Sequence, residues 1–463
     1  MSVRGPLGAT PRSAGFEFSP PALDVRGVSR SSRRALLGIA GLLSTGLLIT
    51  VSAPQTQVLL PESIRPAPTW LAGAFASAGL NLHAGGAAAV LIVMFISYAV
   101  VVAAAGQLSA RLVLMCIAAL YAIVLLAPPL ISTDIFSYQA YARMGSTYGT
   151  NPYLTGPNAI QLDSVFPYIG AKWSYIPSVY GPLFTGLSYL LAPLSIAASV
   201  IAYKLVAVLA SLGVVAMVWN CSRLRGVDPV RSVALVGLNP LLIIYGIGGG
   251  HNDMLMLLAL VAGMYAILAG RERLGGGLTS LAIGIKLTAG LMLPFAIAAR
   301  GPRRGHTRRH DLLTGAGLVM ALIASLSFAL YGTGALSLFD TVRKSQSKGD
   351  WHSISGFIST RLGLVTVGHV VGYLLIVAFV GISAWLLRRV WRGQSDWIDA
   401  AGWSTVAMLI AANSLLPWYV AWLLPLAALG TSRRLVHTSV VLTGVVLVVS
   451  VLGYIPASSL SGL

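Results

Sequence analysis

Asp134 is the side chain in this sequence that is best placed for acid–base chemistry. It comes shortly after the end of an apolar block of membrane-spanning length, and Tyr138 and Tyr141 follow it at helical spacing. A carboxylate that is partly desolvated at the mouth of such a span is a stronger base toward a hydroxyl group than one in water. We therefore expect Asp134 to be a catalytic base. The alternative is that it only caps an exposed helix.

Asp134 belongs to the longest stretch of the chain that is neither clearly apolar nor clearly basic, residues 131–182. This stretch is rich in aromatic side chains, namely Tyr138, Tyr141, Tyr148, Tyr153, Tyr168, Trp173, Tyr175 and Tyr180. Long loops without regular structure are usually either functional or disordered, and disordered segments contain few aromatic residues. The composition thus predicts an ordered loop that forms an active site or a binding site.

Lys286 is a cation in the middle of an apolar stretch, preceded by Gly284 and followed by Pro294. Charged residues at membrane depth usually face a cavity or a partner. A helix that is broken at this point, with its lysine in an aqueous pocket, would suit an anionic lipid headgroup. The alternative is a lysine that extends to the membrane interface.

Three consecutive polar residues, His251, Asn252 and Asp253, follow three glycines at the end of another apolar block. Such residues are costly near hydrocarbon and usually face a cavity or each other. We expect them to share in a binding cavity. The alternative is that Asn252 or Asp253 caps the next helix.

Two further groups of residues are candidates for binding. A predicted loop at 332–361 contains Arg343, Lys344 and His352, a basic cluster that suits phosphate but equally suits a solvated surface. Trp418 and Tyr419 follow a proline near the end of a later span, and they fit either a cavity or an interfacial aromatic belt.

The elements that must position these residues are membrane-spanning helices. The 463 residues are 56% hydrophobic and only 10% charged, with a mean hydropathy of +0.81, and apolar blocks of about 20 residues recur from Ala35 onward. The sequence therefore predicts an all-α, polytopic transmembrane protein. Two cysteines suggest neither a disulfide framework nor a metal site. The net charge of +18 is better explained by cytoplasmic loops that face anionic lipid than by nucleic acid.

The distribution of lysine and arginine predicts how the chain crosses the membrane. Residues 1–32 are expected to form a disordered, basic cytoplasmic tail, and residues 33–463 the transmembrane domain. If every apolar block crosses, there are about 13 spans, and the arginines between 223 and 273 face outward. We prefer about 11 full crossings plus two partial elements, one after Gly181 and one broken around Lys286, because those arginines then face inward. Either scheme puts Asp134 outside.

The ordered series of motifs resembles a known group, the GT-C membrane glycosyltransferases, and within it the actinobacterial polyprenyl-phosphomannose-dependent α-1,6-mannosyltransferases of the MptA/MptB type. The motifs are Asp134-Ile135-Phe136-Ser137-Tyr138, Asn151-Pro152-Tyr153, Tyr180-Gly181-Pro182, Asn239-Pro240, Gly250-His251-Asn252-Asp253, Lys286 and Pro417-Trp418-Tyr419. The resemblance extends from Arg33 to the last span.

The resemblance implies a hexosyltransferase of the plasma membrane with an extracytoplasmic active site. The enzyme would move mannose from a polyprenyl-phosphate donor to a growing lipid-linked mannan, an α-1,6 backbone of the lipomannan or lipoarabinomannan type, with inversion. It gives Asp134 the role of base, and we assign the donor phosphate to Lys286, Arg343 and Lys344. We assign sugar or acceptor contacts to Tyr138, Tyr141, Tyr153, Trp173, Tyr180, His251, Asn252, Asp253, His352, Trp418 and Tyr419.

The sequence departs from the family pattern beside Asp134. Many members carry a second acid there, whereas Thr133 and Ile135 are the neighbours in this chain. A hard divalent cation needs several oxygen ligands, so we expect no metal and no other cofactor. The alternative is that Asp163 lies close to Asp134 in space and supplies a second carboxylate. The rival class is a transporter or flippase of a lipid-linked sugar, which broken helices and an intramembrane lysine also fit. No internal repeat is evident, which argues against this class.

Overall fold

The computed structural model describes residues 30–299, 305–347 and 352–453, and every regular element in these ranges is a helix. The all-α prediction is therefore confirmed. Most of the expected cytoplasmic tail, and Lys348, Asp350 and Trp351 of the second predicted loop, lie outside the described residues.

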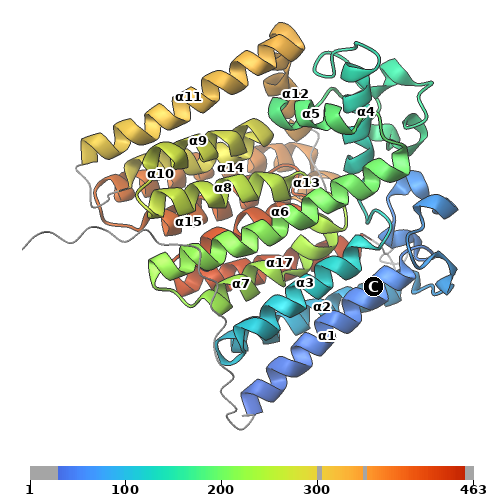
Figure 1. The fold of residues 1–463 in the computed structure, drawn as a ribbon, viewed down its shortest axis with the longest axis horizontal. Coiled ribbons are helices and arrows are strands. Elements are labelled where there is room, and N and C mark those ends of the chain that lie inside the picture. Colours follow the sequence, from blue (N-terminus) through green and yellow to red (C-terminus); the bar gives the residue numbers. More distant parts are fainter. Residues whose placement is uncertain (1–29, 300–304, 348–351, 454–463) are drawn as a thin grey trace, which may run out of the picture.

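Long apolar helices form the body of the molecule (Figure 1). Within the described ranges, six helical segments are long and apolar enough to cross a membrane, which makes the chain a multi-pass membrane protein. These segments contain α1 (Arg30–Ser52), α2 (His83–Ala104), α6 (Ile196–Arg225), α11 (Gly305–Tyr331), α14 (Val365–Trp391) and α17 (Arg433–Leu452). The number of full crossings stays a prediction, because shorter apolar helices accompany them.

The shorter helices pack between the long ones or at one end of the molecule. They are α3 (Ala110–Leu125), α4 (Asp134–Ser146), α5 (Pro182–Ser188), α7 (Pro229–Gly237), α8 (Asp253–Leu268), α9 (Glu272–Ile285), α10 (Met292–Ala298), α12 (Ser337–Ser347), α13 (Ile354–Thr360), α15 (Trp397–Ala411) and α16 (Leu424–Leu429). The predicted loop at 131–182 thus begins with helix α4 and continues in short 3-10 turns.

Two helices are broken at residues that the sequence singled out. Lys286 has an extended backbone, with φ −152° and ψ 123°, and separates α9 from a 3-10 turn and α10. Between α7 and the π-helical turn η10 (Leu241–Ile247), the axis bends by 50° at Asn239-Pro240. The Asn239 amide replaces the lost backbone bonds, since its Oδ1 accepts from the N–H groups of Leu241 and Leu242.

The arginines between 223 and 273 lie at the end of the bundle away from Asp134. Helix α6 contacts α4 near its start and ends at Arg225, which forms an ion pair of 3.1 Å with Asp396. The guanidinium of Arg231 lies against Gly106, in the turn that follows α2. Figure 1 shows α4, α5 and α12 gathered at the end of the molecule opposite to α7. The side of the membrane on which these arginines lie stays a prediction.

Gly181 joins the loop at 131–182 to the break at Lys286. Its N–H donates to the carbonyl of Ile285 at 3.0 Å, and a Cβ at Gly181 would lie 2.2 Å from the carbonyl oxygen of Gly284. Only glycine permits this approach of two backbones. The contact fixes the loop that carries Asp134 relative to the lysine.

We therefore expect Gly181→Ala to destabilise the protein by about 1–3 kcal/mol, because the new methyl group must push two backbones apart. The measurement is the apparent melting temperature in detergent. Gly381→Ala is the control, since a Cβ at Gly381 in helix α14 meets no atom within 4 Å. Equal melting temperatures for the two variants would contradict the proposed packing role of Gly181.

Candidate active site

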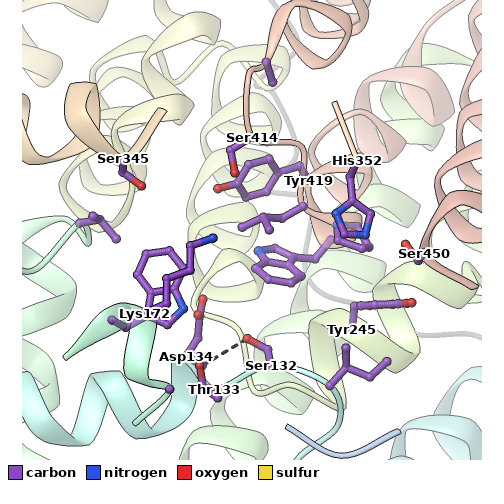
Figure 2. A pocket seen from close by; sticks show the side chains of 18 of the residues that line it. Ser132, Thr133, Asp134, Lys172, Tyr245, Ser345, His352, Ser414, Tyr419 and Ser450 are labelled. Atoms are coloured by element: carbon purple, nitrogen blue, oxygen red, sulfur yellow. Dashed lines mark hydrogen bonds between the residues drawn. The ribbon is translucent and has the colours of Figure 1, made fainter. Parts of the chain in front are cut away.

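Asp134 and Lys286 line one cavity of about 1440 Å³. Loop residues 131–182, the break after α9, and the 3-10 turn η13 (Pro417–Trp422) all contribute to its lining. Of the other residues predicted from the sequence, Trp173, Tyr180, His352, Trp418 and Tyr419 also line it. Figure 2 shows Asp134 and its hydrogen bond to Ser132 on one side of the open space, with Tyr419 and Ser414 across from them.

The first residue of helix α4 is Asp134, and several contacts fix the backbone that leads to it. The N–H of Leu130 donates to Gly248 at 3.0 Å, and that of Ile131 donates to Leu59 at 2.9 Å. The buried ammonium of Lys204 donates to the carbonyls of Val124, Ala127 and Pro128, where α3 ends. The sequence assigned no role to Lys204, and the structure shows that it caps this helix end.

His251 lies directly beside Asp134. Its Nδ1 is 3.3 Å from Oδ2 of Asp134, and its ring stacks on the Trp418 indole with centroids 3.7 Å apart. Burial acts to raise the pKa of the Asp134 carboxyl, but the interaction with His251, the charge of Lys286 and the hydroxyl of Ser132 together hold this pKa below its usual value. Asp134 is therefore ionised at neutral pH and able to accept a proton.

Lys286 is paired with Asp253. Its Nζ lies 2.8 Å from both carboxylate oxygens, and Nε1 of Trp422 donates to the same carboxylate at 2.6 Å. The ammonium also lies 5.0 Å from the ring centroid of Tyr419. Asp253 is fully buried, so it pairs with the lysine and does not line the cavity. Asn252, the residue before α8, makes no side-chain hydrogen bond that caps this helix.

The predicted tyrosines divide into two groups. Tyr180 lines the cavity, whereas Tyr138, Tyr141 and Tyr153 are buried in the packing around it. The hydroxyl of Tyr141 donates to the carbonyl of Ile176, and that of Tyr153 donates to the carbonyl of Tyr180. Tyr138 contacts Asn252 through its hydroxyl, at 3.3 Å from Oδ1. These three rings fix the loop and do not line the cavity.

Other predicted residues lie outside the cavity lining. Arg343 is 80% exposed and lies 3.7 Å from Asp340 on the same helix, α12. Lys344 is also exposed there, while Val342 and Ser345 of α12 do line the cavity. Asp163 pairs with Arg143 at 2.8 Å and accepts from Tyr148, so its carboxylate is engaged within the loop. Within the described ranges no cluster of three His, Cys, Asp or Glu side chains could hold a metal ion.

Sequence reasoning missed two parts of the lining. One is Trp422, which stacks on Tyr419 with centroids 4.1 Å apart and lies one helical turn after Trp418. The other is an apolar surface formed by Ile376 and Phe379 of α14 and by Met408 and Leu409 of α15. Helical spacing after Pro417 would have indicated Trp422, but no local signal marks which apolar residues face a cavity.

The fold and site define a class: a polytopic helical membrane protein in which a carboxylate and a lysine face one large cavity. Residues 36–301 match the family model described as Alpha-(1->6)-mannopyranosyltransferase, N-terminal domain, and residues 352–454 match the MptB C-terminal domain. The first match covers more than half of the chain, and the chain therefore belongs to the MptA/MptB family.

Curated relatives agree with this assignment. An Alpha-(1->6)-mannopyranosyltransferase A of Mycobacterium tuberculosis is 28% identical over 345 residues, which cover 67% of this chain and 65% of the relative. An Alpha-(1->6)-mannopyranosyltransferase B of Corynebacterium glutamicum is 30% identical over 351 residues, which cover 66% of this chain and 56% of the relative. The chain thus spans less than two thirds of the length of these relatives.

The buried pair of Lys286 and Asp253 makes a testable prediction about stability. Asp253→Asn and Lys286→Met should each destabilise the protein by about 3–5 kcal/mol, because each leaves an unpaired charge in an apolar region. The double variant should be closer to the parent than either single variant, as read from apparent melting temperatures. Additive losses in the double variant would show that the two side chains do not stabilise each other.

Proposed function

We propose that the protein is a mannosyltransferase of the plasma membrane, and that it acts on the outer face. In this proposal the donor is a polyprenyl-phosphate mannose, and the acceptor is a growing lipid-linked α-1,6 mannan of the lipomannan or lipoarabinomannan type. The observation that carries it is the composition of one cavity, where the Asp134 carboxylate, the Lys286 ammonium and an apolar surface from α14 and α15 occur together. A sugar–phosphate joined to a lipid has these three chemical parts. Family membership and the names of the relatives support the choice of mannose.

The proposed reaction is a single displacement at the anomeric carbon. Asp134 removes the proton of an acceptor hydroxyl while that oxygen forms a bond to the anomeric carbon. The bond from this carbon to the phosphate oxygen breaks, and its electron pair leaves with the polyprenyl phosphate. Attack from the opposite face inverts the configuration, so a β-linked donor gives an α-linked product. The lowered pKa of Asp134 keeps the base in its ionised form.

Lys286 is the proposed electrostatic partner of the leaving phosphate. Its side chain is 15% exposed and lines the cavity. Its ammonium pairs with the Asp253 carboxylate, which also accepts a hydrogen bond from Nε1 of Trp422. A cation that is already oriented stabilises developing charge without reorganisation. Arg343 and Lys344 are also predicted for this role. They belong to helix α12, of which Val342 and Ser345 line the cavity, but they do not line it themselves. Lys172 of the first loop also lines the cavity. We propose that the phosphate binds nearest Lys286, because this lysine is held in place by Asp253.

The aromatic side chains of the lining supply the proposed sugar contacts. Trp173, Tyr180, Trp418 and Tyr419 line the same cavity as Asp134 and Lys286. His352 lines the same cavity. Aromatic rings bury the apolar faces of sugars at small entropic cost, because few torsions need to be fixed. The mechanism uses no metal, since Asp134 alone supplies the base and Lys286 the positive charge.

Transfer of radiolabelled mannose tests the proposal. Purified protein in detergent, given labelled polyprenyl-phosphate mannose and a mannan-lipid acceptor, should move the label into the glycan. Asp134→Asn should lower the rate by about 10²–10⁴-fold, which is the usual contribution of a general base. Asp340→Asn should keep the parent rate, because Asp340 is 70% exposed and lies outside the cavity lining.

Two results would contradict the proposal. Near-normal transfer by Asp134→Asn would remove this acid from the mechanism. Label that crosses a vesicle membrane while it stays on the polyprenol would favour the transporter class instead.

A further inference from the structure

His251 lies beside Asp134, with Nδ1 3.3 Å from Oδ2, and does not belong to the cavity lining. Its side chain is 0% exposed, and it is absent from the cavity lining to which Asp134 and Trp418 belong. A substrate in the cavity therefore cannot contact the imidazole directly. The sugar-binding role expected from the sequence does not suit this position.

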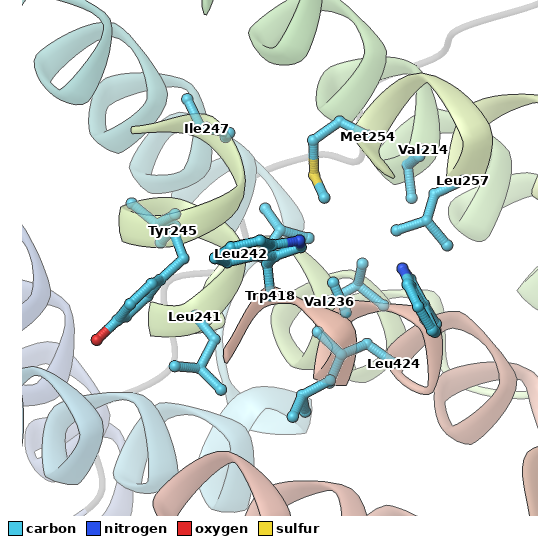
Figure 3. Packing of buried hydrophobic residues seen from close by; sticks show 14 of the residues in the cluster. Val214, Val236, Leu241, Leu242, Tyr245, Ile247, Met254, Leu257, Trp418 and Leu424 are labelled. Atoms are coloured by element: carbon cyan, nitrogen blue, oxygen red, sulfur yellow. The ribbon is translucent and has the colours of Figure 1, made fainter. Parts of the chain in front are cut away.

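The imidazole is fixed from two sides. Trp418 stacks on it at an interplanar angle of 24°, and a Cβ at Gly249 would lie 2.8 Å from its Nε2. Figure 3 shows Trp418 itself among the buried side chains of Leu241, Leu242 and Met254. The ring thus has little freedom to turn away from Asp134.

Among the described residues, neither ring nitrogen of His251 has a hydrogen-bond partner with good geometry. Nε2 has no acceptor to compete for the proton, whereas Nδ1 faces a carboxylate oxygen at 3.3 Å. Nδ1 is therefore the ring nitrogen whose N–H can be donated to this carboxylate. Contacts of this kind in a substrate-free active site are often poorly aligned and tighten when the substrate binds.

We propose that His251 is a positioning residue for the base: it donates its Nδ1–H to Oδ2 of Asp134, so that Oδ1 is the oxygen that takes the acceptor proton. The inference rests on the proposed transfer reaction and adds to it. His251 acts through Asp134 and passes no proton to the substrate, because its buried ring does not line the cavity. The proton stays on Oδ1 until the product leaves and the cavity refills with water.

The proposal makes the pH dependence of transfer informative. Losing the N–H group of His251 removes one of the interactions that lower the pKa of Asp134, so this pKa rises. The base is then protonated at a higher pH, and the acidic limb of the rate profile moves upward. The other charged or ionisable groups that act on Asp134 are Lys286 after α9, Tyr180 in the loop, and Tyr138 and Tyr141 in α4, and none of them is altered.

The experiment compares His251→Asn with His251→Leu, two side chains of nearly equal size. Asparagine can place an amide N–H where Nδ1 lies, whereas leucine cannot. We expect leucine to lower kcat by about 10–100-fold, with a smaller change in donor KM, and to raise the acidic limb by about one pH unit. Asparagine should recover most of the rate and the parent profile. Equal profiles for the two variants, or a parent profile for leucine, would overturn the inference.

The outcome is separable from that of the reaction itself. If Asp134→Asn is inactive while both His251 variants keep the parent profile, transfer stands and the role of His251 fails. If Asp134→Asn is active, the proposed base fails.

Should neither His251 variant accumulate in membranes, Trp418→Leu and Trp418→Phe replace them. Leucine, which removes the stack, should raise the acidic limb, and phenylalanine should not. No shift with leucine would also overturn the inference.

Discussion

The ion pair between Lys286 and Asp253 is the contact on which the rest of this site depends. The Asp253 carboxylate is fully buried and the Lys286 side chain is 15% exposed, and removing one partner of such a pair costs about 3–5 kcal/mol because the other charge is left unpaired. The pair joins the start of α8 to the break after α9, and Gly181 ties the first loop to that same break. Asp134 and Lys286 therefore keep a fixed separation.

Other buried polar side chains near the site also have specific hydrogen-bond partners. Lys204 donates to three carbonyls at the end of α3, from which the chain continues to Asp134. Asn239 satisfies two backbone N–H groups at the bend before η10. In both places a side chain replaces the backbone hydrogen bonds that a broken helix loses. Irregular backbone near the cavity is thus stabilised locally, which leaves the lining free for substrate.

The sequence predicted the helical class, the break at Lys286 and the cavity positions of Asp134, Trp418 and Tyr419, because composition and costly polar residues mark them locally. It could not separate Tyr180, which lines the cavity, from Tyr138 or Tyr153, which are buried. All three tyrosines occur in similar aromatic surroundings. What differs is the tertiary partner of each hydroxyl, and no local pattern encodes that partner. The pairing of Asp253 with Lys286 was missed for the same reason.

The apolar part of the cavity lining has a consequence for how substrates arrive. Ile376 of α14 belongs to this lining and is 40% exposed, and its neighbours on the same helix, Val377 and Val380, are 68% and 58% exposed. In the proposed reaction, the prenyl chain of the donor can therefore approach this lining from within the bilayer, without crossing water. Encounter then follows diffusion in two dimensions, and its frequency depends on the number of carrier molecules per unit area of membrane.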